Sequence, residues 1–194
     1  MCVRPVSTIP PTDAVIPSPH PDAPAPGTKL GSHYSKCFGC GENAAGGLHV
    51  QTTVGEGVSV TTEFRVTENH QGAPGLAHGG LLALALDEAL GNVNWLLHLI
   101  AVTGRLETDY LKPVPVGTTL FIEARCDGIH GRKIYNSAVG RLGGPDGAIA
   151  VRATAIFISV GVEHFLDNGN PAEVKAAMAD PDHTRAARAF EVNP

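Results

Sequence analysis

Residues 58–66 alternate between two kinds of side chain. Every second position, from Val58 to Val66, belongs to one mainly apolar face, and the polar residues between them belong to the other. A period of two is typical of a half-buried antiparallel strand. The Gly-Glu-Gly sequence that ends at Gly57 is a hairpin signal, so residues 48–54 are expected to form a preceding strand.

Residues 79–97 show a different pattern, because apolar side chains occur on nearly every side of a helical projection. The segment contains no proline and is rich in Leu and Ala, which favour a helix. A helix that is apolar all round is a buried helix. We therefore expect one long helix at the centre of the core.

Four further strand-like segments follow the predicted helix, at 102–111, 119–129, 133–142 and 148–160. Short turns rich in Gly and Pro separate them, and this spacing favours an antiparallel meander. The order strand, strand, helix and four strands predicts an α+β fold, in which one antiparallel sheet wraps around one long central helix.

Composition separates the two ends of the chain from this core. The 194 residues include 15 prolines, and eight of these lie at or before Pro26. Proline lacks the backbone N–H and fixes φ, so residues 1–30 are predicted to form a disordered, extended arm. Residues 31–165 are predicted to form a single domain, followed by a 166–194 tail with short helices at 172–179 and 184–190.

Charge and hydropathy exclude several classes of protein. The formal net charge is −5 with no basic cluster, which argues against a nucleic-acid partner. The chain has no apolar run of about 18 residues and no continuous apolar segment at its N-terminus, so we expect neither a membrane span nor a secretory signal. The four cysteines are then expected to be reduced thiols, and the expected location is cytoplasmic.

Two features of the predicted helix suggest chemistry. Gly79 and Gly80 lie at its start, where the first amides lack helical partners, so these amides are suited to bind a carbonyl oxygen or an oxyanion. Asp87 interrupts the apolar run, and a buried carboxylate must be partnered, protonated or functional. Two simpler interpretations stay open: the glycines form only a tight turn, and Asp87 belongs to a solvated stripe with Glu88 and two later asparagines.

The distance between these two features bears on the number of subunits. Asp87 follows His78, the residue before the glycines, by nine positions, which is about 13 Å along a continuous helix. The two side chains cannot meet within one subunit. If both act on one substrate, they come from different subunits, which predicts a homodimer.

Several motifs together resemble a known family. The segment from Gln71 to Gly80 has the pattern Q-G-x-P-G-x-x-H-G-G, and the sequence D-E-A follows at Asp87. Three further patterns extend the match over about residues 37–160. They are the T-x-x-L-x-x-x-Y-L-x-P-V-P-x-G pattern that begins at Thr103, the G-R-K turn and the C-x-x-C-G at Cys37. This combination resembles the hotdog-fold acyl-CoA thioesterases of the PaaI-like branch, in the 4-hydroxybenzoyl-CoA thioesterase superfamily.

The resemblance implies a hotdog fold and a role for each residue of the site. Asp87 would be the nucleophile or general base, and the amide of Gly79 or Gly80 would polarise the thioester carbonyl. His78 would shape that loop, and Thr103 would orient the attacking water. In the family these groups meet across a dimer interface, and two dimers often associate further.

The expected function is hydrolysis of an acyl-CoA thioester to the free acid and CoA. No cofactor or metal ion is expected, because a carboxylate and an oxyanion donor are sufficient. The turn residues Arg132 and Lys133 are the candidates for binding the CoA phosphates, with ordinary solvated charges as the alternative. The acyl group would lie along the helix, where the candidate contacts are Leu84, Leu90 and Trp95.

Two alternative functions were weighed against hydrolysis. The first is a non-catalytic hotdog module that binds acyl-CoA. The second is a hotdog hydratase or dehydratase, but the histidine and carboxylate pattern usual in those enzymes is not found. An aspartate on the helix together with a glycine pair at its start favours hydrolysis.

The cysteines suggest a further, weaker signal. Cys37 and Cys40 form C-x-x-C, which is half of a zinc site. No second pair follows and only His33 and His49 lie nearby, so a structural turn is favoured over a zinc or redox site. Cys126 alternates with inward-facing apolar residues and is expected to be a small buried side chain.

Overall fold

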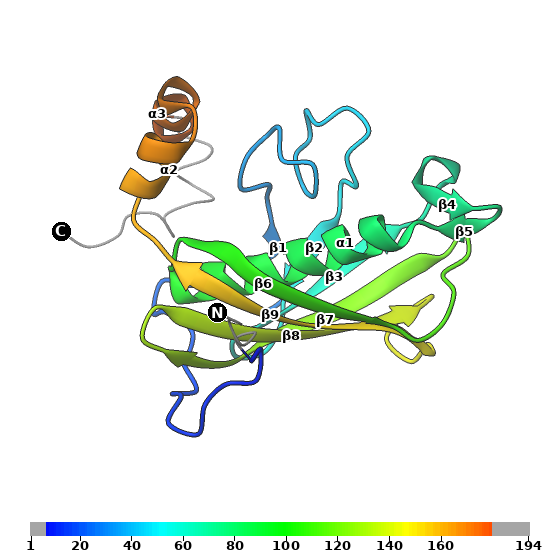
Figure 1. Cartoon of the computed structure of the whole chain (residues 1–194), viewed down its shortest axis with the longest axis horizontal. Coiled ribbons are helices and arrows are strands. Elements are labelled where there is room, and N and C mark those ends of the chain that lie inside the picture. Colours follow the sequence, from blue (N-terminus) through cyan, green and yellow to red (C-terminus); the bar gives the residue numbers. More distant parts are fainter. Residues whose placement is uncertain (1–6, 180–194) are drawn as a thin grey trace, which may run out of the picture.

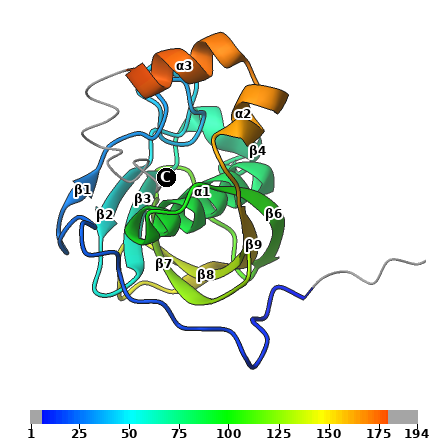
Figure 2. The same cartoon turned by 90° about the vertical axis from the view of Figure 1, so that its left-hand side faces the viewer.

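A seven-stranded antiparallel sheet forms the body of the molecule. The computed structural model describes residues 7–179. From edge to edge the strands are β1 (Lys29–Leu30), β2 (Gln51–Val54), β3 (Ser59–Arg65), β7 (Thr119–His130), β8 (Lys133–Leu142), β9 (Ile149–Ser159) and β6 (Ala101–Tyr110). Figure 2 shows the sheet curving around the helix α1 (Gly79–Asn92). The predicted α+β architecture, with one antiparallel sheet around one central helix, is confirmed.

The predicted helical segment at 79–97 is confirmed, and it changes form near its end. α1 continues directly into a 3-10 helix, η2 (Val93–Leu97), so the predicted segment is helical throughout. His98 follows in the left-handed region with φ 52°, and its N–H donates to carbonyl oxygens of η2. The left-handed residue ends the helical segment there.

The core lies between α1 and the concave face of the sheet. Burial alternates along the strands, as in β7, where Leu120 and Ile122 have no exposed surface. On the helix, Leu86 and Leu90 are likewise fully buried. Since these residues fix which side of α1 faces the sheet, they also determine where the polar residues between them point.

The predicted meander is wrong for its first strand. β7, β8 and β9 do follow one another as a meander, but β6 pairs with β9 at the far edge of the sheet and β7 pairs with β3. The connection after β6 carries Pro113 and Pro115, and it includes the buried Val114 instead of forming a tight hairpin. This connection is long enough to carry the chain to the other side of the sheet, where β3 becomes the neighbour of β7.

Smaller elements flank the sheet and α1 (Figure 1). A 3-10 turn, η1 (Glu68–His70), and the short hairpin of β4 (Gln71–Ala73) and β5 (Leu76–Ala77) lead into α1. After β9 come α2 (Glu163–Asn168), which was not predicted, and α3 (Pro171–Ala179). The predicted helix at 184–190 lies outside the described residues.

The proline-rich segment runs along the outside of the domain in the described residues 7–28. Val15 forms a β-bridge with Ile129, and Thr8 accepts a hydrogen bond from Thr154 and donates one to Glu107. The segment therefore follows the molecule closely over this stretch. The domain boundaries at residues 30 and 165 stay a prediction.

Removal of residues 1–30 is expected to lower the melting temperature by several degrees and to leave turnover unchanged. The deletion removes β1 and the contacts of Thr8 and Val15, but no described residue before His33 lines the cavity that contains Asp87. Thermal unfolding and steady-state turnover of the shortened chain test this expectation. Loss of turnover at a temperature where the shortened chain is folded would contradict it.

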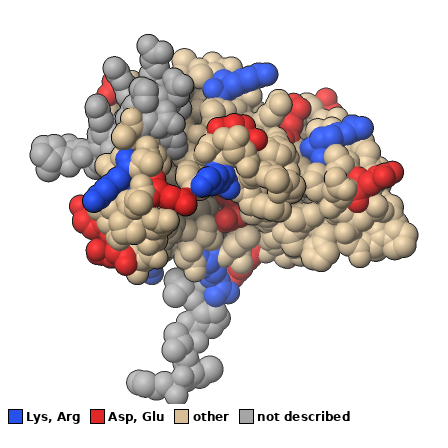
Figure 3. Space-filling view, turned by 90° about the horizontal axis from the view of Figure 1, so that it is seen from above, with Lys and Arg blue, Asp and Glu red and all other residues tan. Residues whose placement is uncertain are grey.

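Charged side chains are spread over the surface. In the space-filling view, Lys and Arg are interspersed with Asp and Glu, and no continuous basic patch forms on this face (Figure 3). Among the described residues, no helix has the length and apolar character needed to cross a membrane.

Candidate active site

Asp87 lies in the wall of an open cavity of about 400 Å³ beside α1. The helical segment supplies Leu84, Asp87 and Trp95, and β6 supplies Thr103. A mainly apolar cavity with a few converging polar groups is typical of a small-molecule site. Two of the three residues expected along the acyl group therefore line the cavity, whereas Leu90 is fully buried in the core.

Thr103 is the hydrogen-bond partner of Asp87. Its Oγ1 donates to Asp87 Oδ1 at 2.9 Å. A β-bulge follows at once, because Thr103 and Arg105 pair with adjacent residues of β9 and leave Gly104 as the extra residue. A β carbon at Gly104 would come within 2.9 Å of a β9 side chain, so a larger residue at the bulge would force that side chain to move. Bulges commonly redirect a side chain next to a functional site.

The environment of Asp87 favours its protonated form more than water does. Burial raises the pKa of the Asp87 carboxyl and the neighbouring Glu88 and Cys37 raise it further, whereas the Thr103 hydrogen bond lowers it. The net shift in pKa is upward. The ionised carboxylate is therefore a stronger base than an exposed aspartate, and one of its oxygens is held in place by Thr103.

The start of α1 presents one open amide instead of two. His78 is the N-cap, and its Nδ1 accepts from the Gly80 N–H at 2.9 Å. Within the described chain, the Gly79 N–H has no hydrogen-bond partner. Tyr110, which sequence reasoning did not single out as a site residue, lies over this turn and donates from its Oη to the Gly79 carbonyl at 2.9 Å. Of the two candidate amides, that of Gly79 is the one free to meet a ligand.

The two halves of the predicted site lie apart within one chain. His78, Gly79 and Gly80 are not among the residues that line the cavity with Asp87. The helix from Gly79 to Asp87 accounts for a separation of about 12 Å. A single described chain therefore brings Asp87 and Thr103 together but does not bring the helix start to them.

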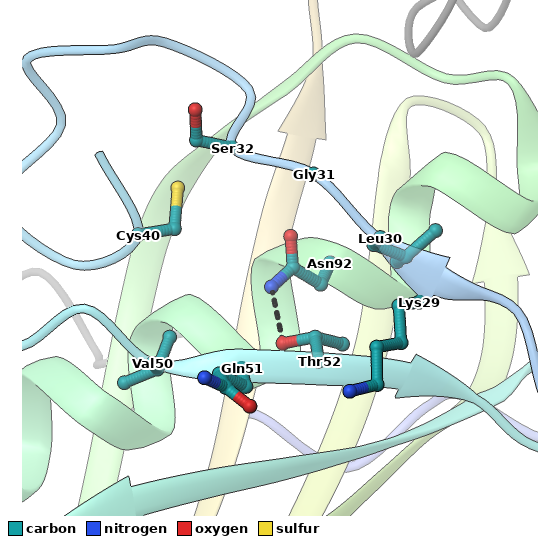
Figure 4. Close-up of a pocket in the computed structure, with 9 residues that line it drawn as sticks. All are labelled: Lys29, Leu30, Gly31, Ser32, Cys40, Val50, Gln51, Thr52 and Asn92. Carbon is teal, nitrogen blue, oxygen red and sulfur yellow. Dashed lines mark hydrogen bonds between the residues drawn. The ribbon is translucent and has the colours of Figure 1, made fainter. Parts of the chain in front are cut away.

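The solvated-stripe interpretation of Asp87 and Glu88 is wrong, because Glu88, Asn92 and Asn94 are buried. Asn92 Nδ2 donates to Thr52 Oγ1 at 3.0 Å, at a second cavity of about 260 Å³ that Figure 4 shows. Asn94 Oδ1 accepts from Asn136 of β8 at 3.1 Å. This side of the helix is held to the sheet by buried polar contacts.

Four side chains with metal-ligand atoms meet beside Asp87. The loop between β1 and β2 supplies His33, Cys37 and Cys40, and α1 supplies Glu88. Sequence reasoning found the C-x-x-C but treated Glu88 as the weaker carboxylate. The histidine four positions before Cys37 was the available signal, whereas the contribution of Glu88 depends on how the loop folds over the helix.

The proposed phosphate-binding residues lie in the turn between β7 and β8. Arg132 is exposed, and its Nε donates to the carbonyl of Ser159 at 3.2 Å. Ser159 pairs with Ala101, which lines the Asp87 cavity. Arg132 and Lys133 do not line that cavity themselves, but β8 pairs with β9, whose Phe157 does.

Comparisons with known proteins point to one family. Residues 74–139 match the Thioesterase superfamily. The acyl-coenzyme A thioesterase THEM4 of Xenopus laevis is 33% identical over 90 residues, which are 46% of this chain and 40% of the relative. A crystal structure of a thioesterase superfamily protein superposes with a TM-score of 0.60 at 28% identity, covering 71% of this chain and 70% of that one. The chain has the hotdog fold and is similar to the thioesterase superfamily.

The hotdog fold is shared more widely. A Streptococcus mutans protein solved with acetyl-CoA is 24% identical, with a TM-score of 0.50 over 53% of this chain and 82% of that one. The chain spans about two fifths of the length of the THEM4 relatives it matches. The family match includes the helix start, Asp87 and Thr103, and it begins after the loop that carries Cys37 and Cys40.

Proposed function

We propose that this chain hydrolyses acyl-CoA thioesters to the free acid and CoA. The observation that carries the proposal is the Asp87 carboxylate, half-buried in an apolar cavity and held by the Thr103 hydroxyl at 2.9 Å. The similarity to acyl-coenzyme A thioesterases supports the same substrate class.

Asp87 acts on the thioester carbonyl in one of two ways. As a general base it takes a proton from a water molecule, whose oxygen attacks the carbonyl carbon while Thr103 holds the carboxylate in position. As a nucleophile it attacks the carbon directly, and water then hydrolyses the mixed anhydride. In both routes the carbonyl oxygen becomes negative and the CoA thiolate leaves.

The Gly79 amide stabilises that negative oxygen. Its N–H is open, and it lies at the positive end of the α1 dipole. His78 supports this arrangement by occupying the Gly80 N–H and fixing the first turn. Because Gly79 and Asp87 of one chain lie about 12 Å apart, the amide is supplied by a second copy in a homodimer.

The position of β6 supports the homodimer. β6 is an edge strand of ten residues, and in the described chain it pairs with β9 on one side only. A long open edge is suited to pair with another strand. β6 carries both Thr103, which donates a hydrogen bond to Asp87, and Tyr110, which donates one to the Gly79 carbonyl. An interface along β6 would therefore include both halves of the site.

A panel of acyl-CoA thioesters tests the proposal directly. Release of free CoA thiol, read with a thiol reagent, is expected for at least one aryl or fatty acyl group. Measurable binding of the acyl-CoA without thiol release would instead favour a non-catalytic module. The cytoplasmic location and the expected lack of a nucleic-acid partner stay predictions.

Charge reversal at Arg132 tests the proposed phosphate contact. Arg132→Glu is expected to raise KM for the CoA thioester about tenfold and to leave kcat unchanged, because one charge-assisted hydrogen bond is worth about 1.5 kcal/mol. The matched control is Arg152→Glu, an exposed cation in the middle of β9. An unchanged KM for Arg132→Glu would show that Arg132 is an ordinary solvated charge in the turn and does not bind the CoA phosphates.

A further inference from the structure

We propose that His33, Cys37, Cys40 and Glu88 bind a zinc ion. We call these four residues the ligand cluster. Three of them come from the loop between β1 and β2 and the fourth from the middle of α1. The ion would therefore join the loop to the helix that carries Asp87.

Three distances within the ligand cluster are close to those of a tetrahedral centre. Zinc bonds of about 2.0–2.3 Å to nitrogen, oxygen and sulfur require ligand atoms about 3.3–3.8 Å apart at the corners of a tetrahedron. His33 Nδ1 lies 3.2 Å from Cys40 Sγ and 3.4 Å from Glu88 Oε1, and Cys37 Sγ lies 3.5 Å from Glu88 Oε2. All four ligand atoms lie within 4.8 Å of one another. A central ion would therefore draw the more distant of these ligand atoms together.

The state of Glu88 is a second, independent observation. Its side chain is 9% exposed, and its Oε1 has no hydrogen-bond partner in the described part of the chain. This oxygen lies at ion-pair distance, 3.4 Å, from His33 Nδ1, and a divalent cation bound between the two atoms would satisfy the buried carboxylate. Gly39 lets the loop backbone approach this group, because a β carbon there would lie within 2.3 Å of Glu88 Oε2.

The chemistry of the cluster selects zinc. Two thiolates with one imidazole nitrogen and one carboxylate oxygen form a borderline-soft set that suits tetrahedral zinc and not magnesium or calcium, which prefer oxygen ligands alone. On binding, the Cys37 and Cys40 thiols each lose a proton to solvent, and no electron is transferred.

Four protein ligands make this a closed, structural site. Catalytic zinc sites leave one position open for water or substrate, whereas closed sites stabilise the fold. His33, Cys37 and Glu88 also line the Asp87 cavity, and Cys40 lines the second cavity (Figure 4). The ion would hold the wall between these two cavities and fix the turn of α1 that carries Asp87.

Elemental analysis of the purified full chain tests the proposal. About one zinc per chain is expected, together with protection of Cys37 and Cys40 from a thiol reagent until a chelator is added. Replacement by cobalt is expected to give the charge-transfer absorption of a thiolate-bound, tetrahedral centre. These measurements do not depend on turnover, so they stand whether or not the chain hydrolyses acyl-CoA.

Matched cysteine variants locate the ion. Cys40→Ser is expected to lose zinc and the cobalt–thiolate absorption, whereas Cys126→Ser, which changes a buried thiol outside the cluster, is expected to keep both. The wild-type cobalt spectrum decides the ligand type even if Cys40→Ser fails to fold. Three outcomes would each overturn the proposal. Folded Cys40→Ser could retain zinc, the wild-type chain could contain no metal and have free thiols, or Cys37 and Cys40 could form a disulfide instead of binding a metal ion.

Discussion

Asp87→Asn is expected to lower kcat/KM for an acyl-CoA thioester by about 10²–10⁴-fold, the usual contribution of a general base. This loss corresponds to about 3–5 kcal/mol of transition-state stabilisation. The asparagine side chain has nearly the same shape, and its carbonyl oxygen can still accept the Thr103 hydroxyl hydrogen bond. It can neither accept a proton from water nor attack the thioester. Steady-state kinetics with the best substrate of the panel measure the effect.

The control for this variant is Asp146→Asn, which makes the same chemical change in an exposed turn after β8. It is expected to keep the wild-type kcat/KM. Thermal unfolding of both variants separates a loss of chemistry from a loss of fold. Turnover by Asp87→Asn that stays within about tenfold of wild type would remove Asp87 from the proposed mechanism, since one factor of ten is only about 1.4 kcal/mol.

Local pattern was sufficient for most of the fold. The period of two predicted the strand at 58–66, and the apolar run predicted the central helical segment at 79–97. Strand order was not available from the same signals, because regular spacing suggests neighbours without specifying which edges meet. The position of β6 beside β9 depends on where the proline-containing connection crosses the sheet, which is a tertiary property.

The site was predictable only in part, because some of its residues stand out in the local sequence and others come together only in the folded chain. Asp87 stood out because a carboxylate interrupts an apolar helix, and the resemblance to a family suggested Thr103. The bulge at Gly104, which directs Thr103 to Asp87, cannot be recognised from the alternation of polar and apolar residues in the sequence. The ligand cluster was missed because C-x-x-C lacks a second pair in sequence, whereas Glu88 completes the group only after α1 packs under the loop.

Gly79→Pro is expected to lower kcat/KM by about 10²–10³-fold, the usual cost of removing one oxyanion donor. Gly79 is the first residue of α1, a position where proline is well tolerated and where its only chemical loss is the N–H. His78 already has φ −70° and ψ 130°, the extended conformation that a residue before proline prefers. The substitution thus removes the proposed donor with little change to the helix.

Gly79→Ala is the matched variant, because it adds a β carbon and keeps the amide. That carbon would lie 3.5 Å from the Tyr110 ring, an ordinary van der Waals contact, so a much smaller loss is expected. Equal activities of the proline and alanine variants would contradict a role for the Gly79 N–H.

A mixed dimer tests whether the two halves of the site come from different subunits. One tagged chain carries Asp87→Asn and the other, with a second tag, carries Gly79→Pro. If each site combines Asp87 of one copy with Gly79 of the other, the mixed dimer contains one doubly altered site and one intact site. Its turnover is then expected to reach about half that of the unmodified dimer, although each variant alone is nearly inactive. Mixed dimers as inactive as the two parents would show that Asp87 and Gly79 do not cooperate across a subunit interface.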